Sequence, residues 1–104
     1  MPTFKTTLDL TDAELEKVAG QFRMLGEPMR LKILQALHSK PLRVGEIVTA
    51  TGATQSNISK HLSLLASSKV IVRHKRGQFV SYGMTNSLTL KLCELVHKEL
   101  LKQT

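Results

Sequence analysis

The hydrophobic repeat of this 104-residue chain changes near residue 68, and this change limits its possible folds more than any other feature. Before that point, apolar residues recur every three or four positions in four short segments, which predicts amphipathic helices. After it, Val70–Lys75 and Phe79–Tyr82 are rich in β-branched and aromatic residues, and Arg76-Gly77 predicts a hairpin turn between two strands. Helical spacing returns over residues 86–102. The predicted fold is therefore mainly α with one β-hairpin, in the order α-α-α-α-β-β-α.

Local signals place the ends of the first two helices. Thr11 followed by Glu14 is a capping box, in which each side chain binds an unpaired amide of the first turn. The first helix should run from there to about Met24. Pro28 suits the first turn of the second helix, which should end before Pro41. Its apolar residues are dense, which predicts a central and largely buried helix.

The next two helices are short and closely spaced. The third should cover residues 44–49, and a tight break at 51–53 contains Gly52, which suits a left-handed helix end. Thr54 should cap the fourth helix, whose apolar stripe is narrow. Two short helices joined by a glycine-containing turn form a helix-turn-helix. Together with the hairpin they predict a winged helix-turn-helix.

Charge is distributed unevenly along the chain. Fifteen Lys and Arg against eight Asp and Glu give a net charge of +7. Residues 1–53 hold seven basic and six acidic side chains, a balance of 7 − 6 = +1, whereas residues 54–104 hold eight and two, a balance of 8 − 2 = +6. No carboxylate lies between Glu46 and Glu94. This asymmetry favours a polyanionic partner, although basic residues can also serve only to solvate a surface.

The fourth predicted helix carries the strongest binding signal. Its start offers amide, hydroxyl, ammonium and imidazole groups, the kinds of donor and acceptor with which a recognition helix reads base edges. A polar solvent-facing side is the alternative, but such sides are usually rich in Glu, and this one has no acid. The predicted DNA-binding residues of this segment are Thr54, Gln55, Ser56, Asn57, Ser59, Lys60 and His61.

The hairpin tip gives a second signal. Cations on an exposed loop contact phosphates or enter the narrow minor groove. Lysines on a hairpin can also serve only to protect an edge strand against aggregation. Beside the fourth helix, the DNA-binding interpretation is favoured, because both elements should face the same side of a winged domain. The predicted wing residues are Arg73, Lys75, Arg76 and Gln78.

Other classes of protein find little support in the sequence. The single cysteine, Cys93, rules out a disulfide-built scaffold, and no nucleophile-base set or glycine-rich phosphate loop predicts an enzyme or a cofactor. No apolar run approaches the roughly 20 residues that span a bilayer. Residues 1–10 lack the apolar core of a signal peptide, so the cytoplasm is the expected location. We predict an N-terminal arm at 1–10 and one domain at 11–104.

Four segments, in order, resemble the ArsR/SmtB family of bacterial winged-helix repressors. The likeness extends over about residues 11–101, nearly the whole chain. It implies a homodimer built on the first and last helices, which binds an imperfect palindrome in double-stranded DNA and is released by an effector. The matching segments are Gly26–Leu34, Val44–Ile47, Gln55–Leu62 and Arg76–Tyr82.

The resemblance does not extend to the family's common metal sites. Metal-sensing members carry cysteines near the start of the third helix, where this chain has Arg43 and Gly45. A second group of members binds metal between the paired last helices through Asp, His, His and Glu. Only one of the four matching residues could bind a metal, so we expect neither site; these residues are Asn86, Leu88, Glu99 and Lys102.

Cys93 and His97 are the candidate effector residues. They stand four positions apart, so they share one face of the last helix. In a dimer, two copies of each could converge on zinc, or the two Cys93 thiols could form a disulfide. The simpler alternative is that Cys93 is a small buried apolar residue and His97 a surface residue.

These features together predict a sequence-specific DNA-binding repressor that acts as a homodimer. Two other classes remain open at this stage. One is a nonspecific or architectural nucleic-acid-binding protein that uses the same basic face. The other is a winged helix that binds an acidic protein partner through its +6 half.

Overall fold

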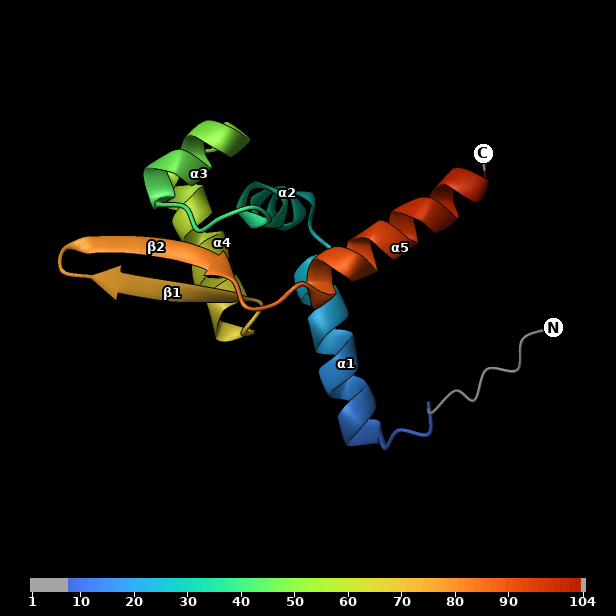
Figure 1. Ribbon diagram of the computed structural model, residues 1–104. Coiled ribbons are helices and arrows are strands. Elements are labelled where there is room, and N and C mark those ends of the chain that lie inside the picture. Colours follow the sequence, from blue (N-terminus) through green and yellow to red (C-terminus); the bar gives the residue numbers. More distant parts are fainter. Residues whose placement is uncertain (1–7, 104) are drawn as a thin grey trace.

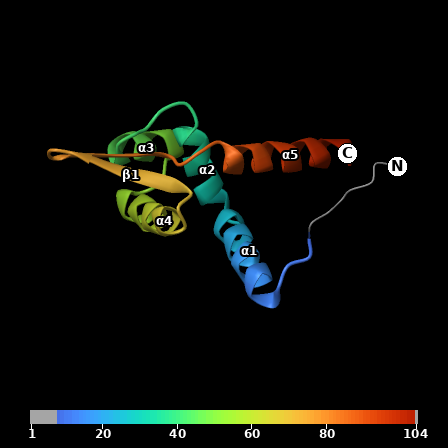
Figure 2. The ribbon, with the colours of Figure 1, turned by 60° about the horizontal axis from the view of Figure 1, so that its bottom comes forward.

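The computed structural model describes residues 8–103. It has five helices and one hairpin in the predicted order (Figure 1). Helices α2, α3 and α4 pack with the root of the hairpin, while α1 and α5 extend from the opposite side of this body (Figures 1 and 2). Most of the predicted N-terminal arm, residues 1–7, lies outside the described part. The elements are α1 (Asp12–Leu25), α2 (Pro28–Leu37), α3 (Val44–Thr51), α4 (Gln55–Ser67), β1 (Ile71–Arg76), β2 (Phe79–Met84) and α5 (Leu88–Lys102).

The predicted signals at the helix starts are confirmed. The Thr11 hydroxyl accepts from the Glu14 amide at 3.2 Å, and the Glu14 carboxylate accepts from the Thr11 amide at 2.9 Å, which completes the capping box of α1. This bonding lowers the pKa of Glu14. Glu27 caps α2 through the Arg30 amide, with Pro28 in the first turn. Helices α1 and α2 therefore begin where the sequence predicts.

Two helix boundaries differ from the prediction. Helix α3 runs on to Thr51, so only Gly52, with φ +74°, ends it. Helix α5 begins at Leu88 because the side-chain oxygen of Asn86 accepts a hydrogen bond from the Leu88 amide at 3.0 Å. Asn86 therefore lies before the helix and satisfies one of its first amides, rather than being its first residue.

The hairpin turn lies one residue later than predicted. Arg76 pairs with Phe79, so the two turn residues are Gly77 and Gln78, and Gly77 takes the positive φ of +59°. The second strand continues to Met84. The root of the hairpin is anchored by a short bridge to the α2–α3 connection.

That bridge adds a third extended segment beside β2. Leu42 and Tyr82 exchange two backbone hydrogen bonds of 2.9 and 2.8 Å. Because Leu42 is buried and Tyr82 packs against the core, the bridge ties one edge of the hairpin to the helical body. It also sets the start of α3 next to the hairpin.

The core lies between α2, α3, α4 and the hairpin root. Helix α2 is buried on one face only, so the prediction that it is largely buried is wrong: Leu31 remains 37% exposed. No residue of α1 or α5 is buried in the described chain. The buried apolar residues are Ile33, Leu34, Leu37, Leu42, Ile47, Ile58, Leu62, Leu65, Val70 and Ile71.

Candidate nucleic-acid interface

Helix α4 is fixed by one apolar stripe and exposes the opposite side. Ile58, Leu62 and Leu65 are at most 1% exposed, which holds the helix against α2 and α3. The Thr54 hydroxyl accepts from the Asn57 amide at 3.2 Å and caps the helix. The positive end of the helix dipole therefore lies at the polar residues that were predicted to read DNA. The exposed members of that set are Thr54, Gln55, Ser56, Asn57, Ser59 and Lys60.

His61 does not lie with this exposed set. Its side chain is only 12% exposed and is turned toward the start of α2. There its Nδ1 accepts a hydrogen bond of 3.2 Å from Nε of Arg30, and its Nε2 lies 3.7 Å from Oε2 of Glu27. The prediction that His61 faces outward is therefore wrong, because the helix turns this position toward a charged pair on another element.

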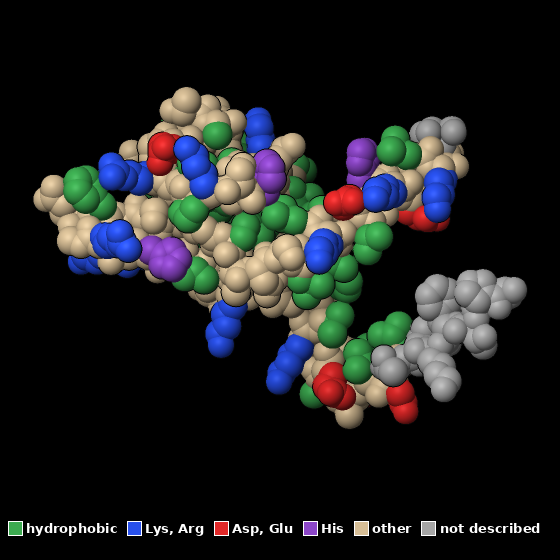
Figure 3. All heavy atoms as spheres, viewed as in Figure 1, with side chains coloured by type: hydrophobic (Ala, Val, Ile, Leu, Met, Phe, Trp, Pro, Cys, Tyr) green, Lys and Arg blue, Asp and Glu red, His purple; other side chains and the backbone are tan. Residues whose placement is uncertain are grey.

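The wing presents its cations on both faces of the hairpin. Side chains alternate along a strand, so Arg73 and Lys75 share the face of Ile71, while His74 and Arg76 lie on the other. The four predicted wing residues, Arg73, Lys75, Arg76 and Gln78, are all exposed. Figure 3 shows Lys and Arg side chains over the wing, with Asp and Glu on α1 and α5 and one near α3.

Arg43 is a basic residue of this region that the sequence analysis did not assign to it. It stands at the start of α3, and the carbon at the centre of its guanidinium lies 4.3 Å from the centre of the Phe79 ring. Arg43 and Phe79 line a groove of about 530 Å³ on the wing. No acid lines this groove; its other residues are Pro41, Arg73, His74, Lys75, Arg76 and Ser81. The sequence did offer a signal for this role, because Arg43 is a basic residue directly before the predicted third helix.

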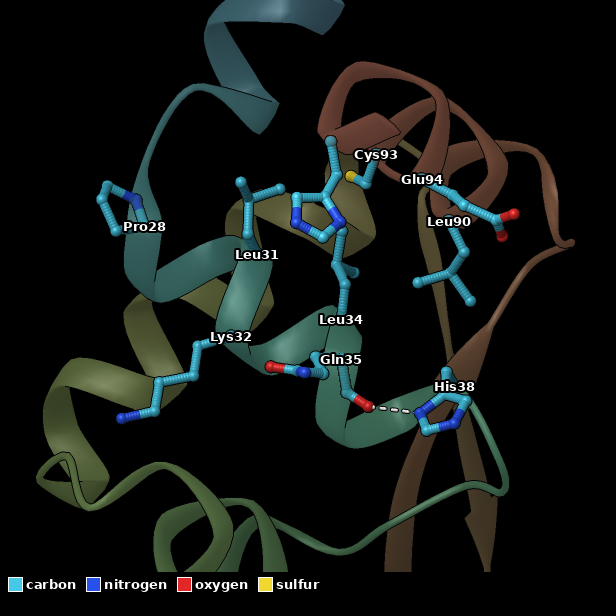
Figure 4. Close-up of a pocket in the computed structure, with 10 residues that line it drawn as sticks. Pro28, Leu31, Lys32, Leu34, Gln35, His38, Leu90, Cys93 and Glu94 are labelled. Atoms are coloured by element: carbon cyan, nitrogen blue, oxygen red, sulfur yellow. Dashed lines mark hydrogen bonds between the residues drawn. The ribbon is translucent and has the colours of Figure 1, made fainter. Parts of the chain in front are cut away.

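A second groove lies between α2 and α5. Its volume is about 790 Å³, and it is lined by Cys93 and His97 of α5 and by His38, which directly follows α2 (Figure 4). Cys93 is half-buried and His97 exposed. His38 Nδ1 lies 2.6 Å from the Gln35 carbonyl oxygen. Among residues 8–103, no three Cys, His, Asp or Glu side chains lie close enough to hold a metal ion.

Helices α1 and α5 expose large apolar side chains in this chain. Phe22 is 62% exposed and Leu95 is 63% exposed. A mostly apolar groove of about 360 Å³ runs between the two helices. Leu15, Val18, Leu88, Leu92, Val96, Leu100 and Leu101 are also exposed. Within the described residues, no helix has the length and hydropathy needed to cross a membrane.

Comparison with known proteins identifies the family. The sequence profile of bacterial regulatory proteins of the arsR family matches residues 27–68. The transcriptional repressor SdpR of Bacillus subtilis is 31% identical over 67 residues, which are 64% of this chain and 74% of SdpR. The cadmium resistance transcriptional regulatory protein CadC of Listeria innocua is 36% identical over 87 residues, which are 83% of this chain and 73% of CadC.

A solved structure agrees with these relatives. The homodimeric winged helix-turn-helix DNA-binding domain of a possible ArsR-family transcriptional regulator from Mycobacterium bovis matches with a TM-score of 0.78 and 26% identity. The match covers 94% of this chain and 96% of that domain. The chain therefore belongs to the ArsR family of bacterial regulatory proteins and is a DNA-binding transcriptional repressor with the winged helix-turn-helix fold, not an enzyme.

Proposed function

We propose that this protein represses transcription in the cytoplasm as a homodimer that binds a palindromic DNA operator. The observation that carries this proposal is the outer side of α4, where the exposed polar residues contain no acid and stand at the helix's positive end. Hydroxyl, amide and ammonium groups there match the donors and acceptors of base edges in the major groove.

The two elements would contribute different kinds of contact. On α4, Gln55, Ser56, Asn57 and Ser59 are short polar residues suited to base edges, with Thr54 and Lys60 beside them. On the wing, Arg73, Lys75, Arg76 and Gln78 are exposed and suited to phosphates or the minor groove. Base contacts would give specificity, and the wing cations would give affinity that depends on salt.

The dimer would form through α1 and α5. These two helices expose more large apolar side chains than a stable monomer usually leaves in contact with water. A second copy of the chain would bury them. The relative from Mycobacterium bovis is homodimeric, which supports a homodimer for this chain. A two-fold axis between these helices would place two recognition helices on one face of DNA, about 34 Å apart, as two half-sites require.

We propose further that repression does not depend on either common metal site of the family. Arg43 stands at one of the cysteine places and lies over Phe79. At the other site, Lys102 and Glu99 form an ion pair of 3.6 Å. Cationic and apolar side chains at these places are poor ligands for a soft metal.

For an effector, the residues to examine are Cys93 and His97 in the α2–α5 groove. The test compares operator binding of the natural protein and Cys93→Ser with zinc or a mild oxidant added. If zinc or the oxidant changes operator binding of the natural protein but not of Cys93→Ser, the Cys93 thiol is the sensor. A response that the variant keeps places sensing elsewhere, and no response in the natural protein removes both residues from the proposal.

Competition separates the proposed function from its rivals. Excess unrelated duplex should displace the protein from random DNA but spare a bound palindromic site. Complete displacement from every duplex would favour a nonspecific or architectural protein. No binding to any duplex at low salt would favour a module that binds an acidic protein.

A further inference from the structure

Arg30 contacts two helices besides its own. It lies in the first turns of α2, where its Nε donates to Nδ1 of His61 on α4 at 3.2 Å. One terminal nitrogen donates to the backbone carbonyl of Met24, in the last turn of α1, at 3.1 Å and lies 3.5 Å from the Met24 sulfur. One planar guanidinium therefore joins α1, α2 and α4.

The imidazole of His61 fits this arrangement only in one protonation state. Because Nδ1 accepts a hydrogen bond, the ring proton lies on Nε2, which is 3.7 Å from Oε2 of Glu27. A proton on Nδ1 would remove the acceptor, and protons on both ring nitrogens would in addition place two cations side by side. Glu27, which caps α2, and Arg30 of α2 are the charged groups within the described chain that contact the ring.

Glu27 is itself held in place by the start of α2. Its Oε2 accepts from the Arg30 amide at 3.0 Å. Burial opposes ionisation of Glu27, but hydrogen bonds from the backbone amides of Met29 and Arg30, together with the charge of Arg30, favour the carboxylate, so the pKa of Glu27 is lowered. The carboxylate stays ionised near neutral pH and supports the Nε2–H form of His61.

We propose that Arg30 is a positioning residue for DNA reading: it fixes the orientation of α4 relative to the last turn of α1. The inference rests on the proposed function, in which α4 reads bases and α1 lies in the dimer interface. A second bond, from Gln21 of α1 to the backbone oxygen of Ser68, holds the far end of α4 at 3.3 Å. Two attachments along one helix define its direction, so the spacing of the two recognition helices depends on Arg30.

The informative variant is Arg30→Lys, which keeps the charge but loses the planar fork. A single ammonium group cannot reproduce the guanidinium's directed bonds to both His61 and Met24. The matched control is Lys32→Arg, the opposite exchange on the same helix. Within the described chain, the exposed Lys32 side chain has no ion pair or side-chain hydrogen bond. His61→Asn is a second variant that keeps an oxygen acceptor near the position of Nδ1.

Binding is measured with the duplex that the natural protein selects from random DNA and with a scrambled duplex of equal length. Temperatures are chosen at which circular dichroism shows every variant folded. We expect Arg30→Lys to bind the selected duplex at least tenfold more weakly and the scrambled duplex within twofold of the natural protein. Lys32→Arg should stay within twofold on both, and His61→Asn should lose less than Arg30→Lys.

Nitrogen-15 NMR of the His61 ring gives a readout that does not depend on DNA. An acceptor Nδ1 resonates well apart from a protonated ring nitrogen, so the expected spectrum near neutral pH shows one of each. Arg30→Lys should change the Nδ1 shift, and Lys32→Arg should not. Such a change, together with loss of selective binding, is the result that supports a positioning role.

Two results would overturn the inference while leaving the proposed function intact. One is that Arg30→Lys binds the selected and scrambled duplexes with the same affinities as the natural protein. The other is a His61 ring protonated on Nδ1 in the natural protein. Failure of the natural protein to prefer any duplex would instead remove the proposed function together with this inference.

Discussion

The guanidinium of Arg43 lies over the ring of Phe79, with 4.3 Å between its central carbon and the ring centre. Arg43 directly precedes α3 and Phe79 begins β2, so the contact joins the helical body to the outer part of the wing. A cation over an aromatic face is worth about 0.5–1 kcal/mol at an exposed site. Together with the Leu42–Tyr82 bridge, it holds the wing at a defined angle to the helix-turn-helix.

Arg76→Ala should weaken binding to all DNA sequences by a similar factor. Arg76 is exposed on the same wing face as Phe79, where a phosphate contact carries no sequence information. If it neutralises one phosphate, the slope of log K against log salt should fall by about 0.9. The measurement is fluorescence anisotropy at several salt concentrations, with Lys91→Ala on α5 as control. Loss of operator binding alone, with an unchanged salt slope, would contradict this role.

Gln55→Ala and Ser56→Ala should reduce specificity instead. Each removes a polar group at the exposed start of α4, and the loss of one base contact costs about 1–3 kcal/mol. Binding to scrambled DNA should change little, because the wing cations remain. Competition between selected and scrambled duplexes measures the ratio. The exposed Gln35→Ala on α2 is the control; equal losses on both duplexes would show that these residues do not read bases.

Leu95→Glu should convert a dimer into a monomer. Leu95 is 63% exposed in the single chain, and a carboxylate at its place could not be buried against a second copy without a partner charge. Sedimentation equilibrium should show the natural protein at twice 11.6 kDa and the variant at 11.6 kDa. Leu64→Glu, at a 39% exposed position on α4, should leave the mass unchanged. A natural protein that is monomeric at micromolar concentration and stays so on DNA would overturn the dimer.

Two glycines of the helix-turn-helix should respond oppositely to alanine. Gly52 has φ +74°, where a Cβ costs about 1–2 kcal/mol, so Gly52→Ala should lower the free energy of unfolding by about that amount. Gly45 lies inside α3, and a Cβ there would meet nothing within 4 Å. Gly45→Ala should therefore raise stability by up to about 1 kcal/mol. Urea unfolding checks both, and equal effects would show that the α3–α4 turn does not need its left-handed residue.

Features that depend on neighbouring residues could be predicted from the sequence. The Thr11–Glu14 capping box is fixed by local bonding over a few positions, and so is the left-handed end at Gly52. The exposed side of α4 followed from the spacing of its three apolar residues. The turn was placed one residue too early because a glycine can occupy either position of a two-residue turn, and only the strand register decides which.

Features that depend on distant partners could not be predicted in this way. His61 belongs to a polar stretch, and only the start of α2, 31 residues away, turns it inward through Arg30. Arg43 gains its place in the wing groove through Phe79, which no periodicity connects with it. Leu31 is 37% exposed although its helix is rich in apolar residues, because it lines the grooves beside α1 and α5 and does not point into the core.

Selection of bound duplexes from random DNA tests the central claim most directly. The proposed homodimer should enrich an inverted repeat whose half-site centres lie about one helical turn, roughly 10 base pairs, apart. A footprint on the enriched duplex should protect both half-sites together. Recovery of duplexes with no shared motif, all displaced equally by competitor DNA, would contradict sequence-specific repression by a two-fold dimer.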